Sequence, residues 1–356
     1  MYTENRKAQR DKRIKNKVEK YRRKKKLDKA IIFLKNELDN NPIAHSELAQ
    51  VYFTLNDFNN ANIYLKGVID LTDGLPFGKY YDDLLDDLEN TYMKLQEKIG
   101  KKIKSNKDSA DLHIFKGLSL LIAHHPDLAI DSFYSAIELN PENLIVYLDL
   151  GKIHYNMEEY QQANNVFTKG IDLLVQKPDL NEDLLLTDLY YNRSMSRWEL
   201  SHSNEDYLKC AYEDAQKVYD DVNLVFGDND DNHYIKNYLM ISANYFFDNG
   251  ECEKAIPLLE RVRSTDPYNP AHVRSLALAY NLMGRYEEAL ELVDLILEDY
   301  EFSEFLHLKA DILQNMDNMD EAVVYFRKFI ASVRKNNIED LMDEANKIEK
   351  QLDELS

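Results

Sequence analysis

Glycine and proline are scarce in this chain, which has 10 glycines and 8 prolines among 356 residues. These 18 residues are about 5% of the chain, whereas the two types make up roughly 12% of an average protein. The tight turns of β-sandwiches and barrels depend on both residue types. Their scarcity therefore argues against an all-β fold and favours a mostly helical protein.

Cysteines and long apolar runs are also nearly absent. The two cysteines, Cys210 and Cys252, form no CxxC pair, which excludes a zinc ribbon and a disulfide framework. No apolar run approaches the roughly 18 residues that a membrane helix needs. The basic N-terminus lacks the apolar stretch of a signal peptide. We therefore expect a soluble protein of the cytoplasm.

Charge is abundant but unevenly distributed. The whole chain has 44 Lys and Arg against 64 Asp and Glu, a net charge of −20. Residues 1–30 contain 14 bases and 4 acids, so this segment carries +10. The remaining 326 residues contain 30 bases and 60 acids and carry −30. One end of the molecule thus differs electrostatically from the rest.

A repeat of 34 residues runs through the sequence. Two stretches align at this shift, with Gly117 on Gly151, Ala129 on Ala163 and Phe133 on Phe167. Two helices approach to 8–10 Å only where the contact residues are small. The shared small residues therefore indicate antiparallel helix pairs, and such pairs must stack to bury their apolar faces.

The pattern resembles the tetratricopeptide repeat, a 34-residue helix–turn–helix unit. That family has a small residue at position 8 and alanine at position 20, with bulky residues around them. Alanines fill position 20 along most of the chain: Ala30, Ala61, Ala129, Ala163, Ala211, Ala255, Ala289 and Ala322. The resemblance implies an all-α, right-handed superhelical solenoid of about nine antiparallel helix pairs with a C-terminal capping helix.

The unit at residues 76–109 is degenerate. The gap from Ala61 to Ala129 equals two repeats, yet Asp83 and Leu95 stand where small residues are expected. Its apolar stripe fits one unbroken amphipathic helix equally well. Longer gaps further on imply longer helices or loops around residues 172–182, 200–207 and 221–232.

The expected domain organisation has three parts. A basic tail at 1–11 precedes the repeat array at 12–336. Residues 337–356 form an amphipathic helix with Ile338, Leu341, Ala345, Ile348 and Leu352 on one face. We interpret this helix as the cap that covers the exposed face of the last repeat.

No catalytic motif is present. The segment 74–79 resembles a phosphate loop but has the wrong glycine spacing and lacks the required Ser or Thr. The segment 228–232 matches the start of a calcium loop, but the required Gly and Glu are missing further on. We therefore expect no enzymatic activity, no metal and no cofactor.

The resemblance also implies a concave groove lined by positions 2, 5, 9, 12 and 13 of each first helix. Its apolar lining would be Ile114, Leu118, Leu121, Leu148, Tyr155, Tyr191, Met195, Trp198, Met240 and Phe247. Its polar lining would be Lys152, Asn192, Asn244 and Arg274, and its basic end Lys12, Lys15, Arg22 and Arg23. Two alternatives remain: these residues pack against neighbouring helices, or insertions cover the groove.

The resemblance favours a non-catalytic scaffold or adaptor that binds a peptide or partner helix in this groove. The alternative is an adaptor to nucleic acid, the ribosome or an anionic membrane through the basic N-terminal repeat, because clustered Lys and Arg attract polyanions. Self-association through the groove is a further possibility.

Overall fold

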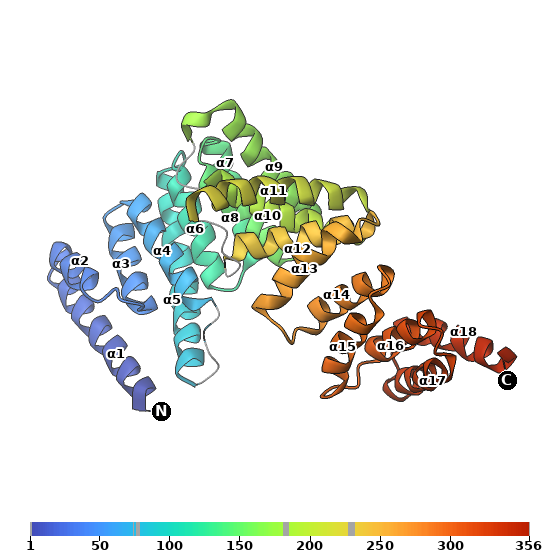
Figure 1. Ribbon diagram of the computed structural model, residues 1–356. Helices are drawn as coiled ribbons and strands as arrows, with labels where there is room; N and C mark the ends of the chain where they lie inside the picture. Colours follow the sequence, from blue (N-terminus) through green and yellow to red (C-terminus); the bar gives the residue numbers. More distant parts are fainter. Residues whose placement is uncertain (1, 74, 76–78, 181–184, 227–231, 356) are drawn as a thin grey trace. The chain divides into compact units, whose positions relative to one another are not determined.

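The computed structural model describes residues 2–73, 75, 79–180, 185–226 and 232–355 (Figure 1). These residues contain 18 α-helices, one short 3-10 helix and no β-strand. The expected all-α fold is therefore confirmed. The chain divides into two compact units, residues 1–183 and 184–356.

The N-terminal unit consists of nine α-helices and the 3-10 helix η1. Their bounds are α1 Tyr2–Arg23, α2 Leu27–Lys35, α3 Pro42–Thr54, α4 Phe58–Thr72, α5 Lys79–Ser105, α6 Ala110–Ile122, α7 Pro126–Leu139, α8 Leu144–Asn156, α9 Tyr160–Gln176 and η1 Pro178–Leu180.

The C-terminal unit also has nine α-helices within its described residues. They are α10 Leu185–Ser201, α11 Asp206–Phe226, α12 His233–Asp248, α13 Cys252–Thr265, α14 Pro270–Leu282, α15 Tyr286–Leu297, α16 Ser303–Asn315, α17 Met319–Asn336 and α18 Glu339–Leu355. The long α9, α10, α11 and α12 contribute to the wide gaps between the repeat alanines, while residues 181–182 and 227–231 of the expected insertions lie outside the described part of the chain.

Short polar caps mark where many helices begin. The side chain of Asn41 accepts a hydrogen bond from the Ala44 amide, and Ser109 accepts one from the Leu112 amide. Such caps satisfy amides that have no partner within the helix. Pro42 and Pro126 occupy first helical positions, where a missing N–H costs nothing.

Glycines allow the two helices of a pair to touch. A Cβ added to Gly117 would lie 2.7 Å from the Phe133 ring, and one added to Gly151 would clash with the Phe167 ring. Both rings are fully buried. The small and aromatic residues aligned in the sequence are therefore the contact between first and second helix.

The degenerate unit is one unbroken helix and not a helix pair; the sequence left both alternatives open. Residues 79–105 form the unbroken α5 (Figure 1), while residues 76–78 lie outside the described part of the chain. Its buried stripe of Leu84, Leu88, Tyr92, Leu95 and Ile99 continues through the whole helix. The described residues therefore contain eight helix pairs, the single α5 and the terminal α18.

Helix α4 packs against α6, and few of its residues lie close to the backbone of α5. In the first turns of α4 and α6, Asn62 Nδ2 donates to the Asp111 carbonyl at 2.9 Å. The last turns of both helices line one pocket, through Thr72 and Ile122. Helices α4 and α6 consequently run in the same direction, with α5 returning the chain between them.

The N-terminal residues differ from the expected separate tail at 1–11. Helix α1 begins at Tyr2 and continues without a break to Arg23. The Lys, Arg and Glu residues that dominate this segment are good helix formers, which explains the extension. Asp11 is buried inside the unit, so this segment belongs to the fold.

The last helix lies where the sequence placed a cap. Ala345, Ile348 and Leu352 of α18 are buried in one apolar cluster with Phe326 and Phe329 of α17. In the region between α17 and α18, Asn337 takes a left-handed conformation with φ of 50°. Asparagine tolerates this conformation better than most residues. Among the described helices, none is long and apolar enough to cross a membrane.

Candidate interaction surfaces

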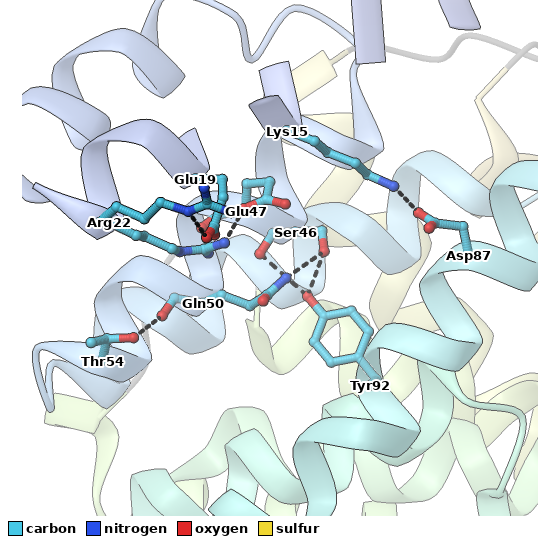
Figure 2. Close-up of polar contacts among 10 residues, drawn as sticks. Lys15, Glu19, Arg22, Ser46, Glu47, Gln50, Thr54, Asp87 and Tyr92 are labelled. Atoms are coloured by element: carbon cyan, nitrogen blue, oxygen red, sulfur yellow. Dashed lines mark hydrogen bonds and ion pairs between the residues drawn. The ribbon is translucent and has the colours of Figure 1, made fainter. Parts of the chain in front are cut away.

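Helix α5 lies against the predicted concave side of the first two repeats. Figure 2 shows the side chains of Lys15, Ser46 and Gln50, which come from α1 and α3 and are directed toward α5. Lys15 forms an ion pair with Asp87 of α5. The buried Tyr92 hydroxyl donates to Ser46 Oγ at 3.0 Å. The groove of these two repeats is therefore occupied by a helix of the same chain.

Further contacts join the beginning of α5 to α1. The Tyr80 hydroxyl donates to Asp11 Oδ2 at 2.7 Å, and Asn41 Nδ2 donates to the other oxygen of Asp11 at 3.0 Å. Burial, then the hydrogen bond to the Asp11 carboxylate, raises the pKa of Tyr80 above its usual value. Lys7 Nζ donates to the Tyr81 hydroxyl at 2.9 Å.

Most of the predicted basic end is already paired within the N-terminal unit. Arg22 lies 2.8 Å from Glu47 (Figure 2). Arg23 lies 2.9 Å from Glu19. Burial raises the pKa of Glu47, and the Arg22 charge opposes that rise. Of the four predicted residues, Lys12 alone has no hydrogen bond or ion pair among the described contacts.

A pocket of about 710 Å³ separates the beginning of α5 from α1 and α3. Lys12 and Lys15 line it from α1, Ile43 from α3, and Asp83 and Asp87 from α5. The beginning of α5 is thus joined to α1 by polar contacts around a cavity, while Leu84 and Leu88 of the same segment are buried.

A second pocket of about 730 Å³ unites four predicted groove residues. Leu118 and Leu121 of α6 and Leu148 and Lys152 of α8 line it together. Its other walls come from α4 and from Leu85 and Leu88 of α5. Leu118 and Leu148 are largely covered, whereas Leu121 is half-buried and Lys152 is exposed.

An ion pair lies in the wall of this second pocket. Lys66 Nζ of α4 is 2.7 Å from Asp149 Oδ2 of α8. Burial raises the pKa of the Asp149 carboxyl, while the positive charges of Lys66 and Lys152 oppose that rise. The pocket therefore combines apolar walls with charges of both signs.

Two other predicted residues of the N-terminal unit belong to packing contacts. Ile114 is 6% exposed, so its predicted place on an open groove does not hold. It is covered because α6 packs between α4, α5 and α7. The half-buried Tyr155 contacts Tyr160 edge-on, with ring centroids 5.4 Å apart.

The predicted groove residues of α10 pack against their neighbours. Tyr191 contacts Tyr234 edge-on at 5.0 Å, and Trp198 packs against the cluster of Ala211, Ala215 and Ile241. Asn237 Nδ2 approaches Met195 Sδ at 2.6 Å. The side chain of Asn192 donates to the Asp188 carbonyl within the same helix at 2.7 Å. The contacts of Tyr191, Met195 and Trp198 hold α10 against α11 and α12, whereas the hydrogen bond of Asn192 stays within α10.

The remaining predicted residues are more accessible. Met240 is 37% exposed, and Arg274 is exposed on α14. Asn244 Nδ2 donates to the Met240 carbonyl at 2.8 Å. Phe247 is half-buried and packs against the core formed by α12 to α16.

Sequence reasoning missed the acidic partners of the basic end. Tyr92 was visible as part of an apolar stripe, but nothing in that stripe said which helices it would contact, and Asp87 lies outside it. Lys66 and Asp149 carried no signal, since each stands in an ordinary polar position of its helix. Within the described residues, no three His, Cys, Asp or Glu side chains are grouped to hold a metal. Most of segments 74–79 and 228–232 lies outside those residues.

Comparisons with known proteins agree with the repeat pattern. Residues 246–328 match a family model described as "Tetratricopeptide repeat". A TPR repeat-containing protein of Methanocaldococcus jannaschii is 23% identical over 243 residues, which are 68% of this chain and 40% of that protein. The chain therefore spans less than half the length of this relative.

Solved structures with related folds have low sequence identity. YrrB, titled a TPR protein with an unusual peptide-binding site, is 18% identical with a TM-score of 0.42, covering 63% of this chain and 95% of YrrB. PilW, titled a type IV pilus biogenesis factor, is 16% identical with a TM-score of 0.44, covering 67% of this chain and 97% of PilW.

Proposed function

We propose that this chain, a tetratricopeptide repeat protein, is a non-catalytic scaffold that binds a peptide of a partner protein in the pocket between α4, α5, α6 and α8. Repeat proteins of this family are generally protein-interaction scaffolds. The observation that supports the site is the meeting of Leu118, Leu121, Leu148 and Lys152 around one pocket.

The lining suggests how a peptide would bind. Leu121 and the α5 leucines offer an apolar surface for an anchoring side chain, which is how a few residues supply most of the affinity at an interface. Lys152 and Asp70 lie on the lining with opposite charges, and they would fix the orientation of the peptide.

A displayed peptide library selected on the purified chain tests this proposal. Leu121→Glu places a charge in the apolar wall, so selected peptides should lose at least tenfold in affinity, measured by fluorescence anisotropy. Lys169→Glu is the matched control, since Lys169 is exposed on α9 outside the pocket. Equal affinities for both variants would show that the pocket is not the site.

A second candidate function rests on the turn between α1 and α2. Lys20, Lys24, Lys25, Lys26 and Lys29 are exposed there, and no ion pair is found for them among the described residues. This group could neutralise phosphates of nucleic acid or an anionic membrane. The triple change of Lys24, Lys25 and Lys26 to Glu should then abolish RNA or vesicle binding, and raising the salt should weaken it. Salt-independent or absent binding would contradict this candidate.

A cytoplasmic location, the lack of enzymatic activity and any self-association stay predictions. The last is measurable as the solution mass of the purified chain by light scattering.

A further inference from the structure

The charges around the pocket between α4, α5, α6 and α8 point to the chemistry of its ligand. We propose that this pocket selects peptides in which a Lys or Arg lies next to the apolar anchor, and that Asp70 and Asp73 receive the positive charge. This inference rests on the proposed function and adds the class of peptide that the pocket takes.

One face of α4 brings both aspartates to the pocket. Four residues of this helix and its C-terminal cap line the pocket at spacings of three or four, namely Lys66, Ile69, Asp70 and Asp73. Residues at these spacings are neighbours on one side of a helix. The last turn of α4 contains no basic residue. Because a helix C-terminus carries partial negative charge, the two carboxylates add to a region that already favours a cation.

The carboxylates of Asp70 and Asp73 are available to a ligand. Both residues are exposed, and within the described part of the chain neither carboxylate has an ion pair or hydrogen bond. The third aspartate of the lining, Asp149, has its counter-charge in Lys66 at 2.7 Å. The described lining residues include three aspartates and two lysines. The excess negative charge therefore lies at the end of α4.

An apolar surface adjoins this charge. Leu85 of α5 and Leu121 of α6 line the pocket and are half-buried, so part of each side chain is open to a ligand. Behind them, Leu88 and Leu118 line the same pocket and are buried. Ile69 lies beside the two aspartates on the lining face of α4. An apolar anchor and a neighbouring cation of one peptide would thus both find their partners in this pocket.

Helix α5 contributes further acids beside Leu85. Asp82 and Glu89 stand three residues before and four residues after it, on the same side of the helix. Asp82 is exposed and Glu89 is half-buried, and neither has an ion pair among the described contacts. An acidic peptide would meet like charges here, so repulsion excludes it while attraction favours a basic one.

Parallel selections from one displayed peptide library, on the wild type and on the double variant Asp70→Lys, Asp73→Lys, test this inference. Lysine is favourable near the end of a helix, so the variant should fold. Peptides from the wild-type selection should contain more Lys and Arg than Asp and Glu. The double variant should bind them at least tenfold more weakly, measured by fluorescence anisotropy, and should itself select the opposite excess.

The double variant Asp131→Lys, Glu138→Lys is the matched control. Both residues are exposed on α7 and neither lines the pocket, while the net charge changes by the same amount. At physiological salt, exposed charges more than about 8 Å apart are largely screened. The control should therefore bind the basic peptides as the wild type does.

Leu121→Glu separates this inference from the proposed function. If it weakens the selected peptides while Asp70→Lys, Asp73→Lys leaves them unchanged, the pocket binds peptides without selecting basic ones, and only the inference is wrong. If the peptides bind Leu121→Glu as tightly as the wild type, the pocket is not the site and both are wrong. Equal weakening by the α4 variant and the α7 control would trace the effect to overall charge and would also overturn the inference.

Discussion

In two of the helix pairs, α6–α7 and α8–α9, the contact between the helices is made by a glycine, a residue without a side chain. Gly117 and Gly151 lie on first helices, each against a fully buried phenylalanine ring of the second helix. These contacts were predictable because the small and aromatic residues recur together at a fixed spacing. Gly100 is different: it lies in α5, and a Cβ there would meet nothing within 4 Å.

Replacing these glycines by alanine should have opposite effects. Gly151→Ala forces the Phe167 ring to move, and overpacking of this kind costs about 1–3 kcal/mol of unfolding free energy. Gly100→Ala removes a flexible residue from a helix interior and should gain up to about 1 kcal/mol. Urea unfolding of both variants measures the difference. A Gly151→Ala variant as stable as wild type would mean that the two helices are not in close contact there.

Among the elements, α5 and α18 show what an amphipathic stripe can and cannot predict. The stripe of α18 follows the last repeat directly, so its burial against α17 was predictable from the order of the elements. The stripe of α5 predicted a helix with one buried face, but hydrophobic periodicity carries no information about the partner surface. Its contacts with Lys15 and Ser46 depend on a chain reversal that local sequence does not encode.

The interpretation of α18 as a cap leads to a prediction at the scale of this helix. Ile348 is 5% exposed within the cluster shared by α16, α17 and α18, so Ile348→Ala should cost about 2–4 kcal/mol. Lys350→Ala, on the exposed side of α18, is the control and should change stability by less than about 0.5 kcal/mol. Thermal unfolding followed by circular dichroism separates the two. If α18 contributed nothing to stability, the unfolding temperature of Ile348→Ala would equal that of the control.

At the scale of the molecule, stacked helix pairs transmit stability mainly to their neighbours. A buried group of charged side chains in the C-terminal unit allows this to be tested. Asp214 is 1% exposed and accepts hydrogen bonds from Arg193 at 2.8 Å through both carboxylate oxygens, and from Arg197 at 2.6 Å. Removing its charge takes away the counter-charge that Asp214 supplies to both guanidinium groups.

Asp214→Asn should therefore destabilise the region around α10 and α11 by about 3–5 kcal/mol. Hydrogen exchange should accelerate in α10, α11 and α12 while α16, α17 and α18 keep their protection. Glu213→Ala, at the exposed neighbouring position, serves as the control. Uniform acceleration throughout the C-terminal unit would instead indicate that its helices unfold as one cooperative block.

The shared direction of α4 and α6 has a consequence for the evolution of this chain. A helix pair brings the chain back to the end of the helices at which it started. A single helix such as α5 leaves the chain at their other end. Deleting α5 would leave the end of α4 and the start of α6 separated by the length of the 15-residue α4, about 22 Å. Any ancestor or engineered variant lacking α5 would need a bridge of roughly seven extended residues to keep the same neighbours.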